Sequence, residues 1–137
     1  MEPFEIIDHT ADVGIAARGE TPEELFANAA AGMFSIITDP NNVEPRTSRP
    51  VTVSGSDRAD LLVAFLNELL FLLETDRFIT RRVEFDRLTE TELAAVIHGE
   101  FIGPKHELET EIKAVTRHEL TVEQRADAWH ATVLFDI

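Results

Sequence analysis

The chain has 137 residues, the usual length of one domain, and 44% of them are hydrophobic, which is enough for one apolar core. It carries 26 acidic and 12 basic residues, so its formal net charge is −14 at pH 7. This balance disfavours strong direct binding to nucleic acid, which needs lysines and arginines, and docking on an anionic membrane. The absence of cysteine excludes disulfides, thiolate metal sites and thiol nucleophiles.

The sequence predicts neither export nor membrane insertion. The acidic N-terminus has no basic segment followed by an apolar run, as a secretory signal would. The longest apolar stretch is interrupted by Asn67 and Glu68, so no membrane span is predicted. We therefore expect a single cytoplasmic domain over residues 1–137.

The first elements in the chain are predicted to be strands followed by a helix. Phe4–Asp8 and Val13–Arg18 have the apolar content of two strands, or of one bent strand. Thr21 can cap a helix that has Pro22 in its first turn and Glu24 completing a capping box. Apolar residues then recur at helical spacing until the turn signal at residues 39–42: Leu25, Ala29, Met33 and Ile36 or Ile37.

A second helix is predicted after Gly55, with Ser56 or Asp57 as its N-cap. Its apolar residues cover more than half of its circumference, so we expect it to be the most buried element: Leu61, Leu62, Phe65, Leu66, Leu69, Leu70 and Leu73.

Most of the remaining chain alternates between apolar and polar residues, which is typical of antiparallel strands with one solvated face. The apolar members of this pattern are Val83, Phe85, Leu93, Ala95, Ile97, Phe101, Ile112, Ala114, Leu120, Val122, Trp129, Ala131, Val133 and Phe135. These elements predict an α+β fold, with two helices packed on one largely antiparallel sheet or open barrel.

The sequence contains no common catalytic motif. His106-Glu107 and His118-Glu119 begin like the zinc-protease helix motif, but the fourth residue after each histidine is not a histidine. There is also no phosphate-binding glycine loop and no serine in a nucleophile elbow.

The densest polar cluster is the segment Asp8-His9-Thr10-Ala11-Asp12. Oxygen-rich clusters of this kind suit hard divalent cations, although the same residues also form ordinary turns. At the other end of the sequence, Asp136 and the main-chain carboxylate of Ile137 would supply further anionic groups, unless this end simply frays.

Two other polar positions depart from their surroundings. Lys113 lies in a strand pattern, where a single lysine is usually a solvated edge residue. Asn67 and Glu68 interrupt the leucine-rich helix, so each must reach solvent, a partner or a hydrogen-bonding group.

Four motifs, taken in chain order, resemble those of the archease family. They are Asp8-His9-Thr10-Ala11-Asp12-Val13-Gly14, Leu66-Asn67-Glu68-Leu69, Lys113-Ala114-Val115-Thr116-Arg117-His118 and Asp136-Ile137. The likeness covers nearly the whole chain, and it departs from the family at Arg117, where a tyrosine is common. The resemblance implies an α+β fold with a largely antiparallel sheet.

The resemblance also implies a function and a site. Archeases are non-catalytic accessory proteins of the RtcB-type RNA ligase in tRNA splicing and RNA repair, and they promote GTP-dependent guanylylation and multiple turnover of that ligase. The implied ligands of a divalent metal (calcium, magnesium or manganese) are Asp12, Asp136 and main-chain oxygens of Ile137. Asp8 and His9 would be neighbours of the metal, and Lys113 a functional contact.

Two alternative functions stay open at this point. A metal-dependent hydrolase could use Asp8, His9 and Asp12, and it would turn over phosphoesters without a ligase. A chaperone-like module for RNA-processing proteins would act without metal chemistry.

Overall fold

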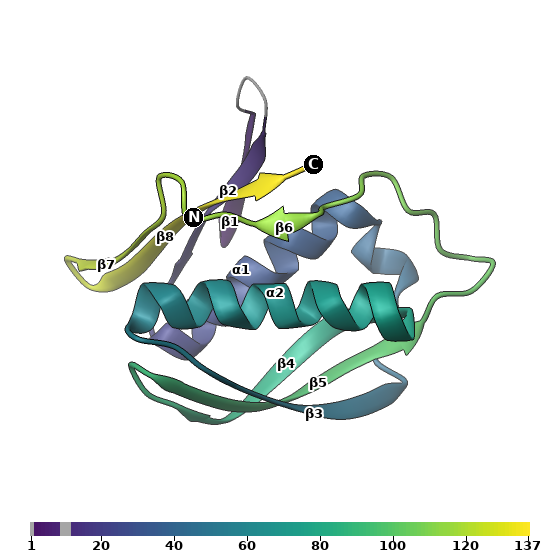
Figure 1. The fold of residues 1–137 in the computed structure, drawn as a ribbon, viewed down its shortest axis with the longest axis horizontal. Coiled ribbons are helices and arrows are strands. Elements are labelled where there is room, and N and C mark those ends of the chain that lie inside the picture. The colour runs from purple at the N-terminus through teal and green to yellow at the C-terminus, as the bar shows by residue number, and fades with distance from the viewer. Residues whose placement is uncertain (1, 9–11) are drawn as a thin grey trace.

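The structure is a computed structural model, and it describes residues 2–8 and 12–137 (Figure 1). The described residues form two α-helices and eight strands, which confirms the α+β prediction. The helices are α1 (Pro22–Ile37) and α2 (Arg58–Asp76), and a short 3-10 helix, η1 (Pro40–Asn42), follows α1. The strands are β1 (Phe4–Asp8), β2 (Val13–Gly19), β3 (Thr47–Ser54), β4 (Phe78–Leu88), β5 (Glu92–Phe101), β6 (Ala114–Val115), β7 (Thr121–Arg125) and β8 (Ala128–Asp136).

The strands are divided between two antiparallel sheets, where the sequence predicted one sheet or barrel. In the first sheet the order is β1-β2-β8-β6, and β7 also pairs with β8; in the second it is β3-β5-β4. Figure 1 shows both helices between the two sheets, and each helix contacts strands of both. The two sheets stay separate because the helices fill the space between them.

Both helices begin at the side chains that the sequence predicted. The Thr21 hydroxyl accepts a hydrogen bond from the Glu24 N–H at 3.1 Å, and Asp57 Oδ1 accepts one from the Asp60 N–H at 2.8 Å. These contacts satisfy amide groups that have no partner inside a helix. Arg77 caps the C-terminal end of α2, and its left-handed backbone (φ 58°, ψ 34°) lets its N–H donate to the Leu72 carbonyl.

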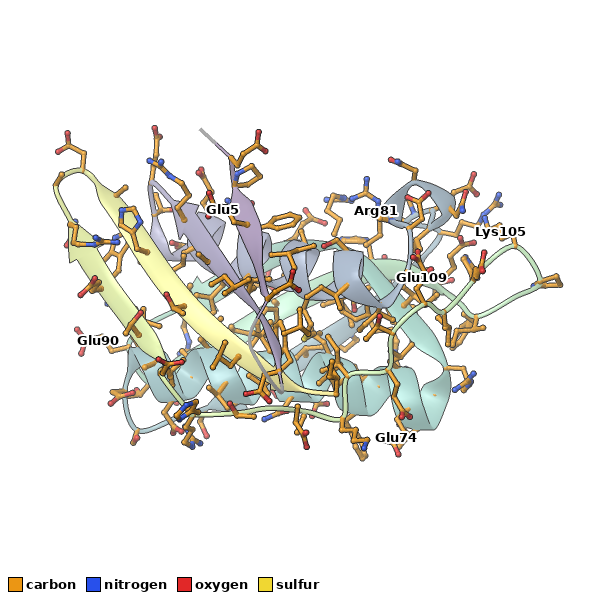
Figure 2. All side chains as sticks on the ribbon, turned by 90° about the horizontal axis from the view of Figure 1, so that it is seen from above. Glu5, Glu74, Arg81, Glu90, Lys105 and Glu109 are labelled. Carbon is orange, nitrogen blue, oxygen red and sulfur yellow. The ribbon has the colours of Figure 1, made fainter. Side chains whose placement is uncertain are left out.

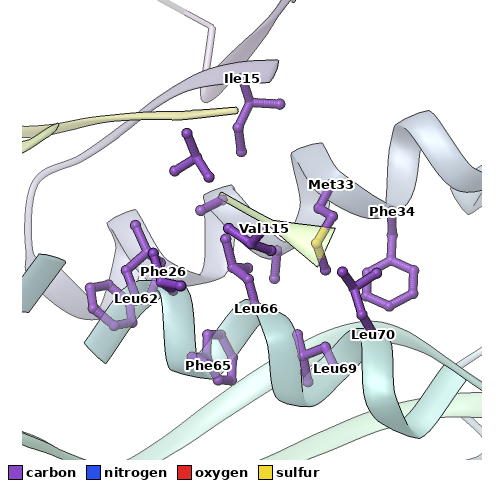
Figure 3. Close-up of a cluster of buried hydrophobic side chains, with 14 of the residues drawn as sticks. Ile15, Phe26, Met33, Phe34, Leu62, Phe65, Leu66, Leu69, Leu70 and Val115 are labelled. Atoms are coloured by element: carbon purple, nitrogen blue, oxygen red, sulfur yellow. The ribbon is translucent and has the colours of Figure 1, made fainter. Parts of the chain in front are cut away.

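The core lies between the helices and the inner faces of the sheets (Figure 3). Its fully buried members include Ile15, Phe26, Met33, Leu62, Phe65, Leu66 and Leu69. The rings of Phe26 and Phe65 join the two helices, with centroids 6.2 Å apart. Burying each such side chain contributes about 1.5–3 kcal/mol to stability. Although α2 is strongly apolar, no helix in the described part of the chain is long and apolar enough to cross a membrane.

The segment between β5 and β6, residues 102–113, has little regular structure but is attached to the body at both helix ends. The Ile102 N–H donates to the carbonyl of Arg77, just after α2. The buried hydroxyl of Thr38, just after α1, donates to the Glu107 carbonyl at 2.6 Å. These bonds fix the course of the chain toward β6.

Glu100, at the end of β5, is the third attachment point of this segment. Its Oε2 accepts hydrogen bonds from the Lys105 ammonium at 2.8 Å, the Glu44 N–H at 2.8 Å and His106 Nε2 at 3.0 Å. His106 Nδ1 accepts from the Gly103 N–H, so Nε2 carries the proton that faces Glu100. The Lys105 ammonium, followed by the Glu44 N–H, lowers the pKa of Glu100 from 4.5 to about 2.

We predict that Glu100→Gln lowers the free energy of unfolding at pH 7, and that the difference from wild type narrows as the pH falls from about 4.5 toward 2. A carboxyl group with a lowered folded-state pKa stabilises the fold above its unfolded pKa and loses that effect when it is protonated. Urea unfolding across this pH range measures the difference. Glu90→Gln, in the exposed turn between β4 and β5, is the matched control. A difference in the free energy of unfolding that does not change with pH would contradict the lowered pKa of Glu100.

Candidate functional site at the junction of β2, β6 and β8

The pairing of β2 with β8 brings residues from the two ends of the sequence together. Val13 lies opposite Phe135 in the antiparallel register, so one further step places Asp12 opposite Asp136. Val13 and Phe135 point into the core. Because side chains alternate between the faces of a sheet and direct partners share a face, the two aspartates belong to the outer face. Asp12 is half-buried and Asp136 is exposed.

Strand β6 adds Lys113 to the same corner of the sheet. Ala114 pairs with Asp136, and the Lys113 N–H donates to the Asp136 carbonyl at 2.7 Å. The Lys113 side chain is exposed, as expected for an edge residue, and it makes no ion pair within the described residues. In Figure 1 the end of β8 lies between β6 and the β1–β2 hairpin.

The predicted alternation around Lys113 is wrong in one respect. The sequence pattern placed Ile112 and Ala114 on a common apolar face, whereas the buried residues are Ile112 and Val115. Only Ala114–Val115 forms a strand, so the chain leaves its extended alternation just before β6. Lys113 lies just before β6, and it also lines a pocket together with residues of α2.

A hydrogen bond made by Asn67 explains why this polar residue interrupts the apolar face of α2. Its Oδ1 accepts a hydrogen bond from the Val115 N–H at 3.0 Å. An edge strand of two residues has few hydrogen bonds of its own, so this contact joins β6 to the helix. Asn67 therefore positions Lys113 through the backbone, and the polar residue inside a leucine-rich helix was the sequence signal for it.

Arg117 makes a second connection to α2. Its Nη2 lies 2.5 Å from Asp60 Oδ1, in the first turn of the helix. A hydrogen bond from the Ser56 N–H lowers the pKa of Asp60, and Arg117 lowers it further. The segment after β6 is thus held to the start of α2 by an ion pair.

The structure does not assign the two remaining predicted residues, Asp8 and His9, to this corner. Asp8 pairs with Val13 at the end of β1, so the register assigns it to the face opposite that of Asp12 and Asp136. His9 lies outside the described residues. The roles of Asp8 and His9 as neighbours of a metal stay predictions.

The groups at this corner suit a hard cation by their chemistry. Two carboxylates, Asp12 and Asp136, are joined by main-chain oxygens of Ile137, and all of these donors are oxygen atoms. Within residues 2–8 and 12–137, no three side chains of histidine, cysteine, aspartate or glutamate are grouped to hold a metal. A site here would therefore need the main-chain donors as well as the two side chains.

The fold and this corner define a class of small α+β proteins, with two helices between two antiparallel sheets and a C-terminal strand that ends in an aspartate and pairs with β2. The chain matches the archease protein family over residues 4–137, and it belongs to that family. It is 40% identical to protein archease of Methanosarcina barkeri, over 98% of this chain and 95% of that protein. It is 36% identical to protein archease of Sulfurisphaera tokodaii over the full length of both.

Two solved structures share the fold. The solution structure of a Methanobacterium thermoautotrophicum protein superposes with a TM-score of 0.83, at 36% identity and complete coverage of both chains. The crystal structure of an archease from Thermotoga maritima, described as a possible chaperone, has a TM-score of 0.66 at 22% identity, over 96% of this chain and 94% of that one. The two-sheet arrangement is therefore shared with solved structures.

We predict that Gly14→Ala lowers the free energy of unfolding by about 1–3 kcal/mol, because it forces overpacking at the β2–β8 pairing. An added Cβ would lie 2.5 Å from both the Leu134 side chain and the Val133 carbonyl oxygen. Gly103→Ala is the control, since nothing lies within 4 Å of its added Cβ. Chemical denaturation measures the free energy of unfolding of both variants. Equal values for Gly14→Ala and Gly103→Ala would show that the sheet accommodates the methyl group.

Proposed function

We propose that the chain is a non-catalytic activator of an RtcB-type RNA ligase in tRNA splicing and RNA repair. It would promote GTP-dependent guanylylation of the ligase and permit multiple turnover. This proposal is supported by the pairing of β8 with both β2 and β6 in a chain of the archease family, because these registers direct Asp12, Asp136, Ile137 and Lys113 toward one corner of the first sheet. These are the residues to which the family resemblance assigns function.

We infer that Asp12, Asp136 and main-chain oxygens of Ile137 hold a divalent cation: calcium, magnesium or manganese. When bound, such a cation offsets the repulsion between the carboxylates and can stabilise negative charge on phosphate oxygens. Lys113 supplies a second positive group, because its ammonium is exposed and makes no ion pair among the described residues. The formal charge of −14 favours action on the ligase over direct binding of RNA.

The alternative of a metal-dependent hydrolase receives less support. That reaction would draw on Asp8 and Asp12 together, and the β1–β2 and β2–β8 registers assign these two residues to opposite faces. A chaperone-like role remains distinguishable by experiment, since stimulation of the ligase would then not depend on metal.

We predict that Asp12→Asn weakens binding of Ca²⁺ or Mn²⁺ at least about tenfold and removes ligase stimulation, because one of few charged ligands becomes neutral. Titration calorimetry and the guanylylation rate of a cognate ligase with GTP are the two measurements. Asp127→Asn, in the exposed turn between β7 and β8, removes the same charge and should change neither. Unchanged metal affinity in Asp12→Asn would remove Asp12 from the site.

We predict a different result for Lys113→Ala, namely lower stimulation of guanylylation with metal affinity and melting temperature close to wild type. The side chain is exposed, so its removal leaves no cavity, and it donates no oxygen to a cation. Calorimetry, thermal unfolding and the ligase assay on one preparation separate these effects. A melting temperature lowered as far as by a core truncation would make Lys113 structural.

A further inference from the structure

A pocket of about 450 Å³ lies beside the junction of β2, β6 and β8, between the C-terminal ends of both helices and residues 108–113. Its volume falls within the range of ligand clefts. The floor is apolar and is formed by Ile37, Leu70, Leu73 and Ile112. Leu108 forms part of the wall, and it stays 43% exposed although it is a large apolar side chain.

The rim of this pocket is acidic. Glu74 from the last turn of α2 faces the pocket together with Glu109 and Glu111 from the facing segment. These three carboxylates make no salt bridge within the described part of the chain. Arg77 and Lys113 also line the pocket, so the carboxylates outnumber the cationic groups. Figure 2 shows Glu74 and Glu109 in the same half of the molecule, on α2 and on the facing segment, with Glu90 at the far end.

The two helix ends make the pocket more negative. Helix α1 ends at Ile37 and α2 ends at Asp76, and neither helix has a basic residue in its last turn. The C-terminal end of a helix carries a partial negative charge that a cation ordinarily complements. Here neither last turn contains a basic residue, and Arg77, the residue that follows α2, provides the cation at that helix end.

We propose that this pocket binds a peptide segment of a partner protein in which an arginine adjoins an aliphatic residue. The alkyl stem of an arginine and the aliphatic neighbour would cover the apolar floor, while the guanidinium would face carboxylates on two walls. A nucleic acid or free phosphate would instead meet three carboxylates against two cationic side chains, together with two helix C-termini. The inference rests on the proposed function in supposing a protein partner, and it adds the surface and the chemistry of that partner.

The test is an NMR titration of the ¹⁵N-labelled full chain with the probe peptide acetyl-Leu-Arg-Leu-amide. The same peptide with citrulline in place of arginine is the neutral control of nearly equal shape. We expect amide shifts concentrated at residues 70–77 and 108–113, with clearly weaker binding of the citrulline peptide. Glu74→Gln/Glu109→Gln should weaken the arginine peptide about fivefold, whereas Glu5→Gln/Glu90→Gln, which removes the same charge elsewhere, should have little effect.

Three results would overturn the docking site: equal binding of both peptides, shifts scattered over the acidic surface, or equal loss of affinity in the two double variants. A concentration-dependent dimer that protects the pocket would identify a second copy of the chain as its occupant instead. The titration contains no ligase, so its failure leaves the proposed activation unaffected. Failure of the wild-type chain to stimulate a ligase would overturn the proposed function and leave the peptide result standing.

Discussion

The antiparallel pairing of β2 with β8 is the interaction on which the rest of the molecule depends. It joins residues 13–19 to residues 129–135, forms the centre of the first sheet and buries Val13 and Phe135 together. The same register places the acidic residues that flank these strands on one outer corner. Stability and the candidate site therefore share one set of backbone hydrogen bonds, so a change that breaks the β2–β8 pairing affects both.

The helices serve as more than the apolar middle layer. Asn67 accepts a hydrogen bond from β6, and Asp60 binds Arg117 just beyond β6, so α2 holds the shortest strand at two points. Both contacts use polar side chains that face the first sheet. A strand of two residues could not be kept in register by its own ladder, and the polar residues of the helix compensate for its length.

Much of the fold could be predicted from the sequence, because local patterns encode local structure. The caps Thr21 and Asp57 and the leucine-rich face of α2 are confirmed. The division into two sheets was not predictable, since period-two alternation gives the orientation of side chains but not the partner of each strand. The irregular segment 102–113 was also missed, because its course depends on distant groups such as Glu100 and Thr38. For the candidate site, the motifs supplied the candidate residues, whereas their expected proximity follows only from the register of β2 and β8.

The β2–β8 pairing also has a consequence for the order of folding. Strand β8 follows every other element in the chain, yet it occupies an inner position in the first sheet. During synthesis, β1, β2 and both helices leave the ribosome before their central partner exists, so the long-range pairing forms after the local elements. A chain interrupted before β8 would expose one edge of β2 and would lack Asp136 and Ile137. Incomplete products of translation would thus differ from the folded chain by an unpaired strand edge.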